Sequence, residues 1–574
     1  MLFAGANDGG VHGFDAETGE ELIYYVPRGV YTQLSQLTSQ TYGHKYFADA
    51  PPAAGDAFLD GEWVTVVVGG LGAGGQGIYA LNVTNPGDAG GSTSLFSESD
   101  ADDLVLWDFT DKDDPHLGRT YGEPQIVKMP NGKWAAVIGN GYNNSEDDDT
   151  DGFCTDGDPD TYCRVSDTGH AYLFILFLEG PGNDGVWDLG TDYIRIDTGV
   201  GDVATPNGLS TPFVADANFD FVADLIVAGD VYGNVWRFDL LDSCEYSDTE
   251  LRYLCSGDSG VSGATSNWKV AFEDNSAPAP LFVTNGGTLG TQTGQPITTR
   301  PLVSFHPVFP EQGFAVYFGT GKYLETGDNE DENQITQSYY AVWDKNDSAQ
   351  PPATSAITLS DLFEQTVVEE VVQSFDGNGD GDTTDQEDPT VRARVTSNNT
   401  FTWRTGATAS TDPNNPDFLG WYIDFVDPAS TSNPQDNRGE KQVSDAILRD
   451  GLLIFTTLIP SDSPCEFGGN GWLMVLDSRD GSRPPEAPVD FNGDGLFNSA
   501  DYVTLSDGST VAAASGVQTT VGIVSTPGIL SKYEDGVFPG VNYAYLSGSD
   551  GSVEKLDLNP GDLPFGRQSW IQVR

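Results

Sequence analysis

Short apolar runs alternate with glycine-rich turns along the whole chain. One apolar run, a turn and a second run ending near Asp form a unit, as in "LIVAGDVYGNVWRFDL" from Leu225. Glycine adopts the unusual backbone angles of tight turns, so each unit predicts a β-hairpin. Further copies start at Leu2, Val64 and Asn542, and three are split: "WAAVIGNGYNN" with "GHAYLFILFL", "FAVYFGTGKYL" with "QSYYAVWD", and "LLIFTTLIP" with "GWLMVLDSRDG".

A proline-marked strand precedes most of these hairpins. The five examples are "DAPPAAGDAF", "GEPQIVKM", "STPFVAD", "TRPLVSF" and "STPGIL". One strand followed by a hairpin, repeated about seven times, is typical of propeller blades. We therefore predict an all-β chain that folds as a single seven-bladed β-propeller over residues 1–574. The alternative is a pair of β-sandwiches with coincidental hairpins.

Long acidic or polar segments interrupt the repeat. We expect loop insertions at about residues 143–168, 345–440 and 478–520. The second insertion contains one apolar segment, "LSDLFEQTVVEEVVQSF", which fits either a helix or a strand.

The charge balance excludes several kinds of partner. The chain has 87 acidic and 26 basic residues, a formal net charge of −61. Such a field repels nucleic acid and anionic membrane surfaces, so we predict neither as a partner. The chain has no apolar run of the ~18 residues that a membrane span requires. This composition fits a surface protein or one that binds divalent cations.

Four of the five cysteines fall in close pairs, Cys154 with Cys163 and Cys244 with Cys255. Neither spacing is that of a zinc site, so we expect local disulfides and an oxidising compartment. Cys465 is left over. The chain opens on "MLFAGANDGG" without a signal peptide. We therefore expect that an exported form has lost its leader.

Two insertions contain a loop with the spacing of a calcium site. A hard cation takes six to eight oxygen ligands, and alternate oxygen-bearing residues can point inward around one centre. The first loop is "DGNGDGDTTDQE", with Asp376, Asn378, Asp380, Asp382 and Glu387 as candidate ligands. The second is "DFNGDGLFNSAD", with Asp490, Asn492, Asp494, the Leu496 carbonyl, Asn498 and Asp501. The alternative for either is a solvated acidic loop.

A shorter acidic loop precedes the hairpin at Leu225. Its candidate ligands are Asp216, Asn218, Asp220, the Val222 carbonyl and Asp224. Phe221 stands where a calcium loop usually has glycine. Composition alone leaves a calcium site and a solvated turn open.

Catalytic signals are few. The five histidines are scattered, and none lies beside an obvious nucleophile in the sequence. The G-x-G-x-x-G at Gly70–Gly75 has no crossover helix after it, and no C-x-x-C-H haem motif exists. We predict no catalytic residue and no cofactor other than Ca²⁺.

Several segments together resemble the C-terminal β-propeller of the PilY1 family of type IV pilus assembly and adhesion factors. They include "FAGANDGGVHGFDAETGEEL", "GHKYFADAPP", "VIGNGYNN", "ADANFDFVADLIVAGDVYGNVWRFDL", "YFGTGKYLETGD" and "LIPSDSPCEFGGNGWLMVLD". The resemblance spans nearly the whole chain in the family's order. The N-terminal region typical of the family is not present in this sequence.

The resemblance implies a modified seven-bladed propeller on a secreted, pilus-associated protein. It also implies that the 216–224 loop binds calcium and tunes pilus extension against retraction. The implied partners are pilins or minor pilins at a pilus tip, with host or abiotic surfaces as further candidates. The implied location is the cell surface or pilus, at the outer membrane or outside the cell. Two rival hypotheses are a quinoprotein-type dehydrogenase and a glycan-binding propeller. Against the first, this sequence lacks the adjacent Cys-Cys pair of such enzymes.

Overall fold

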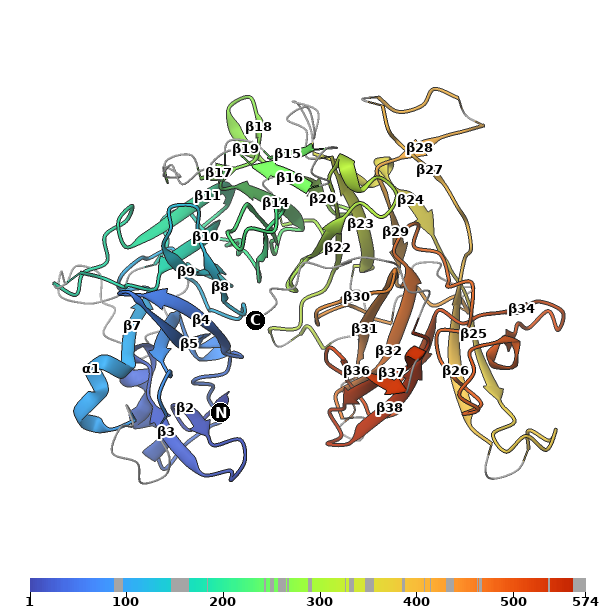
Figure 1. Cartoon of the computed structure of the whole chain (residues 1–574), viewed down its shortest axis with the longest axis horizontal. Helices are drawn as coiled ribbons and strands as arrows, with labels where there is room; N and C mark the ends of the chain where they lie inside the picture. The colour runs from blue at the N-terminus through green and yellow to red at the C-terminus, as the bar shows by residue number, and fades with distance from the viewer. Residues whose placement is uncertain are drawn as a thin grey trace. The chain divides into compact units, whose positions relative to one another are not determined.

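The regular secondary structure of the described part of the chain is almost entirely β-strand, as predicted (Figure 1). The one short α-helix is α1 (Ala101–Leu104), and 3₁₀ turns such as η1 (Arg28–Thr38) make up the other helical segments described. No helix among the described residues is long and apolar enough to cross a bilayer. The computed structural model describes all residues except 87–95, 146–164, 183, 242–243, 248–251, 256–264, 266–267, 288–291, 326, 330–334, 346–355, 385–387, 407, 413, 430–437, 462, 464–466, 535–536 and 561–574.

The chain forms two compact units, one built around Met1–Gly294 and the other around Gln295–Gln350 and Ile357–Ile571. The described residues contain seven sheets of three or more strands, four in the first unit and three in the second. Seven such sheets agree with the predicted number of blades. The prediction of a single domain over the whole chain stays a prediction.

The first unit contains four antiparallel sheets in chain order. They are β1 (Leu2–Gly5), β2 (Val11–Phe14) and β3 (Glu21–Tyr25); β4 (Ala53–Leu59), β5 (Glu62–Gly70), β6 (Gly77–Asn82) and β7 (Val105–Thr110); β8 (Gln125–Lys128), β9 (Trp134–Gly139), β10 (His170–Phe177) and β11 (Tyr193–Gly201); and β12 (Phe213–Ala215), β13 (Leu225–Gly229), β14 (Asn234–Asp239), β17 (Lys269–Val270) and β20 (Phe282–Val283). Two small hairpins are β15 (Cys244–Ser247) with β16 (Arg252–Cys255), and β18 (Phe272–Asp274) with β19 (Ala277–Ala279).

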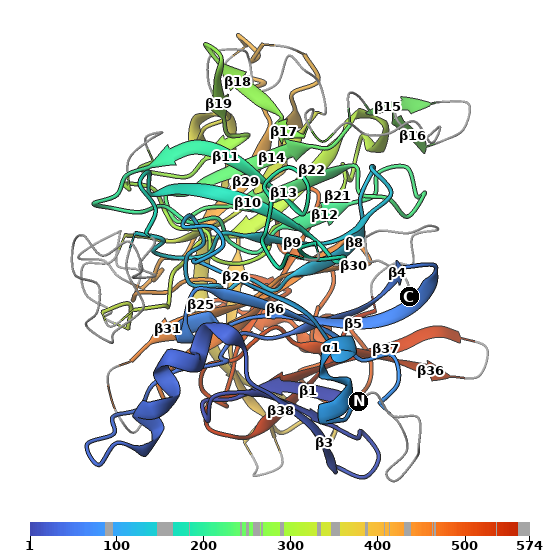
Figure 2. The same cartoon turned by 90° about the vertical axis from the view of Figure 1, so that its left-hand side faces the viewer.

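Successive sheets of the first unit pack face to face (Figure 2). In β10, Leu173 and Ile175 enter the core shared with β13 and β14, whereas Phe174 and Leu176 enter the core shared with β5 and β6. Alternate side chains of a strand point to opposite faces, so a strand buried on both faces must be apolar throughout. The uninterrupted run "AYLFILFL" therefore marks a central strand.

The second unit contains three sheets, of five, six and three strands. They are β21 (Leu302–Phe305), β22 (Phe314–Gly319), β23 (Ser338–Asp344), β29 (Gly420–Asp424) and β24 (Phe363–Gln365); β25 (Val367–Ser374), β26 (Thr390–Thr396), β35 (Gly516–Gln518), β32 (Gly469–Asp477), β31 (Leu452–Pro460) and β30 (Ile447–Arg449); and β36 (Gly528–Glu534), β37 (Val537–Ser547) and β38 (Val553–Leu558). Two-stranded pairs are β27 (Thr402–Trp403) with β28 (Asp417–Phe418), and β33 (Val503–Thr504) with β34 (Val511–Ala512).

All seven predicted hairpins are present. The split copies pair as β9 with β10, β22 with β23 and β31 with β32. The proline-marked strands are β4, β8, β12, β21 and β36, and each pairs with the first strand of its hairpin. The apolar segment of the second insertion forms β24 and β25, which resolves its ambiguity in favour of strands.

The segments predicted as insertions contribute strands to the sheets. β29 lies within residues 345–440 and pairs with β23, and β35 lies within 478–520 and pairs with both β26 and β32. Most of the 143–168 segment, with Cys154 and Cys163, lies outside the described residues, as does Cys465. Cys244 faces Cys255 in the register of β15 and β16, and their disulfide stays a prediction.

A buried ion-pair network ties the second insertion into its sheet. Arg394 of β26 is fully buried and bonds Glu370 and Glu440 at 2.7–2.8 Å. Its guanidinium carbon lies 4.2 Å from the ring centroid of Trp472 on β32. Burial alone would raise the pKa of Glu370, but Arg394 and Arg438 outweigh it and lower that pKa to about 2. The buried Glu370 carboxylate therefore stays ionised because the arginines lie beside it.

We predict that Arg394→Ala lowers the free energy of unfolding by about 3–5 kcal/mol, because it takes from the buried Glu440 carboxylate the arginine that neutralises it and removes one of the arginines bonded to Glu370. Arg392→Ala is the matched control: Arg392 also bonds Glu370, at 2.8 Å, but is exposed, so its loss costs about 0–1 kcal/mol. Urea unfolding measures both. Because the pKa of Glu370 is depressed, its contribution is present above the unfolded value and is lost as the pH falls toward about 2. Equal effects of the two substitutions would contradict this account.

Candidate metal-binding loops

The first candidate loop, residues 216–224, joins β12 to β13. The Asp224 N–H donates to the Ala215 carbonyl at 2.8 Å and closes the hairpin. The Ala223 N–H donates to the Lys128 carbonyl, at the end of β8, at 2.9 Å. The base of the loop is therefore fixed to two sheets.

Asp216 organises the turn. Its Oδ1 accepts hydrogen bonds from the N–H groups of Phe219 at 2.6 Å and Asp220 at 3.1 Å, and its Oδ2 accepts one from Phe221 at 2.8 Å. A carboxylate that accepts several backbone N–H groups bends the chain around itself. The loop is consequently wrapped around its first predicted ligand.

The other predicted side chains continue this arrangement. Asn218 Oδ1 accepts from the Asp220 N–H at 2.8 Å, and Asp220 Oδ1 accepts from the Val222 N–H at 2.8 Å. Asp224 Oδ2 accepts from the N–H groups of Ala217 at 2.6 Å and Asn218 at 3.2 Å. The structure thus brings all five predicted residues into one hydrogen-bonded turn.

Burial makes this turn electrostatically unfavourable. Asn218 and Asp224 are 1% and 2% exposed, and Asp216 is half-buried. Burial raises the pKa of Asp216, the Phe221 N–H opposes that rise, and the nearby Asp220 carboxylate adds to it. A positive charge placed in the loop would stabilise the ionised form.

The 376–387 loop has the same hydrogen-bond pattern. Asp376 Oδ1 accepts from the Gly379 N–H at 2.7 Å, and its Oδ2 accepts from the Gly381 N–H at 2.8 Å. Asn378 Oδ1 accepts from the Asp380 N–H at 2.9 Å. The N–H group of Gly381, with those of its neighbours, lowers the pKa of Asp376. The loop is folded as a single turn around its first Asp.

The residue after the predicted closing ligand bonds to the start of this loop. Glu387 lies outside the described residues. Asp388 Oδ1 accepts the Gly377 N–H at 3.0 Å, which is the bond that Asp224 makes in the first loop. Asp382 donates its N–H to Asp380 at 2.8 Å, so its backbone belongs to the turn. Asp388 is a candidate ligand that the sequence pattern missed, because the spacing favoured its neighbour.

The 490–501 loop repeats the pattern a third time. Asp490 accepts from Gly493 at 2.7 Å through Oδ1 and from Gly495 at 2.8 Å through Oδ2. Asn492 Oδ1 accepts from the Asp494 N–H at 3.1 Å. These three bonds recur in the other two loops, where the N–H groups of Asp220 and Asp380 also donate to the first Asp.

Asp501 closes this third loop. The buried Asp501 accepts from the Phe491 N–H at 2.9 Å and from the Asn498 N–H at 3.1 Å. Burial raises the pKa of Asp501, against the opposing effect of these N–H groups. Leu496 donates its N–H to Asp494 at 2.7 Å, and its side chain is exposed.

The two loops of the second unit lie together. Phe375 directly precedes the first of them, and its ring centroid lies 5.2 Å from that of Phe491 in the other. Gln373 donates to the Tyr502 carbonyl at 3.1 Å and accepts the Thr504 N–H at 2.8 Å. Sequence spacing gave no sign of this contact, since more than a hundred residues separate the loops. The 216–224 loop belongs to the other unit.

The donor set fits a hard cation. Every predicted ligand supplies carboxylate, amide or carbonyl oxygen, which suits calcium better than a transition metal. Within the described part of the chain, no three His, Cys, Asp or Glu side chains are grouped so that they could hold a metal ion. The carboxylates instead accept the N–H groups of their own loops.

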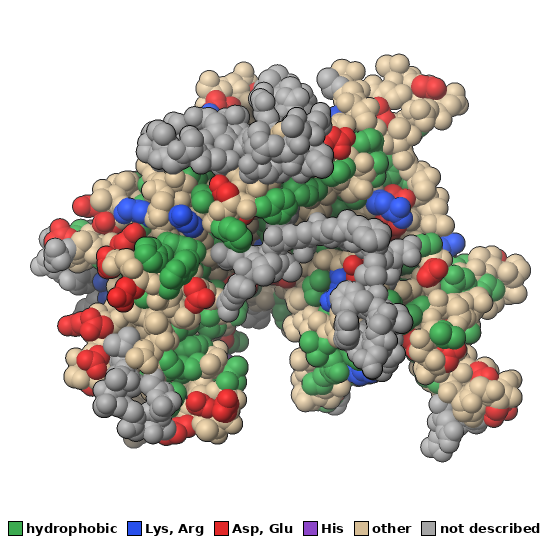
Figure 3. Space-filling model, viewed as in Figure 1, with side chains coloured by type: hydrophobic (Ala, Val, Ile, Leu, Met, Phe, Trp, Pro, Cys, Tyr) green, Lys and Arg blue, Asp and Glu red, His purple; other side chains and the backbone are tan. Residues whose placement is uncertain are grey.

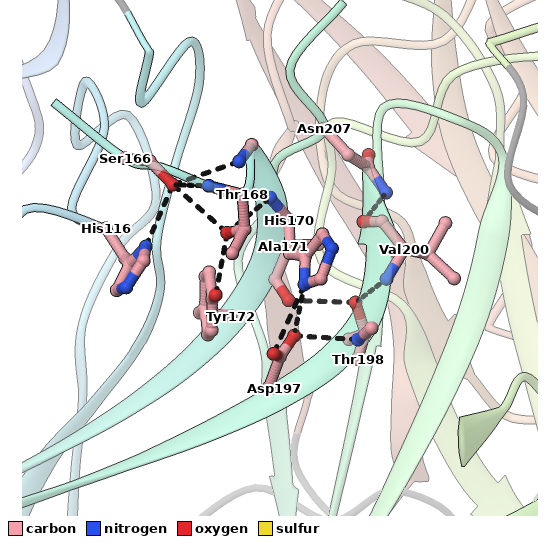
Figure 4. A network of polar contacts seen from close by, with 12 residues as sticks. His116, Ser166, Thr168, His170, Ala171, Tyr172, Asp197, Thr198, Val200 and Asn207 are labelled. Atoms are coloured by element: carbon pink, nitrogen blue, oxygen red, sulfur yellow. Dashed lines mark hydrogen bonds and ion pairs between the residues drawn. The ribbon is translucent and has the colours of Figure 1, made fainter. Parts of the chain in front are cut away.

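A polar cluster elsewhere contains the contact closest to a catalytic pair (Figure 4). His116 Nδ1 lies 2.8 Å from Ser166 Oγ, a pairing that the sequence did not predict because fifty residues separate the two. Ser166 is 1% exposed, and its Oγ also accepts the Gly169 N–H at 3.0 Å. Burial, followed by the charge of Arg195, lowers the pKa of His116. A buried serine that accepts the N–H of Gly169 caps a turn.

Acidic side chains are not confined to the loops. On the face drawn in Figure 3, Asp and Glu are spread widely rather than gathered in one patch. This distribution agrees with the net charge of −61.

Comparisons with known proteins agree on one family. The model of the PilY1 beta-propeller domain matches residues 1–159 and 185–378. The chain is 30% identical over its whole length to a type IV pilus biogenesis factor PilY1 of Pseudomonas aeruginosa, and 29% identical to a homolog from Xylella fastidiosa. It spans 42% and 33% of the length of those relatives. The crystal structure of the Pseudomonas aeruginosa PilY1 C-terminal domain covers 98% of this chain, and the match covers 92% of that domain, with a TM-score of 0.69 and 27% identity.

We predict that Asp216→Ala speeds hydrogen exchange at the amides of Phe219 and Phe221 by about tenfold in calcium-free buffer, because it removes the charged acceptor of both N–H groups. Asp220→Ala is the control, since it removes the acceptor of the Val222 N–H alone. Exchange mass spectrometry of peptides covering 216–224 measures the change. Unchanged rates in Asp216→Ala would show that this carboxylate does not hold the turn.

Proposed function

The chain belongs to the PilY1 beta-propeller family, and on this premise we propose that it is a non-enzymatic, calcium-binding protein of the type IV pilus. The single observation that supports this most is the match over the full chain to type IV pilus biogenesis factors. The chain spans less than half of those relatives, so the role proposed is that of this propeller.

Calcium would be held in the 216–224 loop by oxygens of Asp216, Asn218, Asp220, Val222 and Asp224. The ion would supply positive charge to the Asp216 carboxylate, whose burial disfavours ionisation. The chain's own part is to fix those oxygens on a base that is bonded to two sheets. The loops at 376–388 and 490–501 are further calcium sites in this proposal, with Asp388 added to the first.

Charge links the ion to the role. A net charge of −61 opposes compact packing by self-repulsion, and bound divalent ions relieve part of it. Calcium outside the cell would therefore keep the acidic loops in one shape. A pilin or minor pilin at the pilus tip, or a surface to which the pilus adheres, would recognise that shape. We propose an exported protein at the pilus or cell surface that primes assembly and regulates extension against retraction.

We predict that a strain carrying only the Asp216→Ala, Asp224→Ala variant assembles or retracts pili abnormally, because the variant loses two carboxylate ligands of one site. Twitching and surface piliation are the measurements, with export level and circular dichroism as checks on folding. The matched control is Asp15→Ala, Asp507→Ala, which removes two exposed carboxylates that also accept turn N–H groups outside the candidate loops.

Normal twitching and piliation with the variant at wild-type level would remove calcium control from the account. The purified protein can also be mixed with a quinone, an alcohol and a redox dye. Reduction of the dye that requires the quinone would contradict the non-enzymatic role and support the dehydrogenase hypothesis.

A further inference from the structure

Two phenylalanines stand at the tip of the 216–224 loop. Both Phe219 and Phe221 have φ of +67°, in the left-handed region where a β-carbon is unfavourable. The structurally equivalent positions of the other two loops are glycines, all with positive φ: Gly379, Gly381, Gly493 and Gly495. Glycine is the residue that adopts this conformation without strain.

The strained conformation leaves both phenylalanines in contact with solvent, Phe221 more than Phe219. Phe219 is 39% exposed and Phe221 is 67% exposed. The residues of the loop that do enter the core are small, Ala217 and Ala223. The ring of Phe221 is too exposed to add much to the core, and its backbone conformation does not stabilise the turn. Strain that the fold does not need is a sign of function.

The candidate calcium ligand also orients the two phenylalanines. Asp216 accepts the N–H of Phe219 through Oδ1 and that of Phe221 through Oδ2. The backbone of both residues is therefore bonded to the same carboxylate. The exposed Asp220 lies between them in sequence, so the tip presents two aromatic side chains around an acidic one.

We propose that this aromatic tip, Phe219–Asp220–Phe221, is the docking surface for a cationic, apolar patch on a pilus subunit. The proposal rests on the function proposed above and names the part of the loop that touches the partner. Two exposed aromatic rings suit a contact with apolar side chains, and Arg or Lys beside them would face both ring and carboxylate. A net charge of −61 repels an acidic partner and a second copy of this chain.

Replacing both residues by glycine separates docking from calcium binding. The Phe219→Gly, Phe221→Gly variant keeps every carboxylate and gives the loop the glycine pattern of its two counterparts, so its calcium affinity stays equal or rises. We expect its affinity for pili purified from the producing strain to fall at least tenfold in millimolar calcium, measured by co-sedimentation. Raising the salt concentration should weaken the wild-type interaction, because opposite charges contribute to it.

Phe467→Gly is the matched control. Phe467 is also exposed, at 59%, and also has a positive φ, of +52°, but lies outside the loop. It should bind pili as the wild type does. Calcium titration of each variant checks that the loop still binds the ion.

Each outcome decides the proposal. Equal binding of pili by the double-glycine variant and the wild type would overturn it, as would no binding by the wild type. Calcium-dependent binding to phosphatidylglycerol vesicles that needs both phenylalanines, without binding to pili, would assign the tip to a membrane and also overturn it. Loss of pilus binding in the double-glycine variant, while Asp216→Ala, Asp224→Ala still binds pili, would uphold docking and reject calcium control.

Discussion

Carboxylates held within one turn repel one another unless donors or cations face them. This constraint acts throughout a chain with a net charge of −61, and it is most severe where the acids are buried. In the 216–224 loop, backbone N–H groups donate to the carboxylates, and three of them donate to Asp216 alone. In the second unit, the positive charge of Arg394 offsets the repulsion between the buried carboxylates of Glu370 and Glu440. An added cation has the largest effect where N–H groups leave the pKa of the acid raised, as at Asp216.

The fold supplies the rigid support for that loop. β12 and β13 are short strands of a sheet that is buried on both faces, and the loop leaves this sheet between them. The tip of the loop is its most exposed part, since Ala217, Asn218, Ala223 and Asp224 are buried. A change in the tip is therefore confined to a few residues. That confinement suits a contact whose shape depends on a bound ion.

Glycine and proline made most of the fold predictable, because hairpin turns and edge strands require them at fixed positions. The strands β29 and β35 were missed because each lies inside a segment assigned as a loop insertion, although β29 is itself largely apolar and buried. Asp388 and the pairing of His116 with Ser166 were missed for another reason. Both depend on where the backbone returns after a long interval, and local spacing carries no such information. The resemblance to the family identified the 216–224 loop, whose composition alone left two interpretations open.

Calcium at the 216–224 loop is the central claim, and a crystal structure grown with calcium tests it most directly. Data collected at long wavelength would reveal the ion by its anomalous signal. The account predicts a peak within about 2.3–2.6 Å of oxygens from Asp216, Asn218, Asp220, Val222 and Asp224. No peak there at saturating calcium, with the carboxylates still accepting only the N–H groups of their own loop, would contradict it.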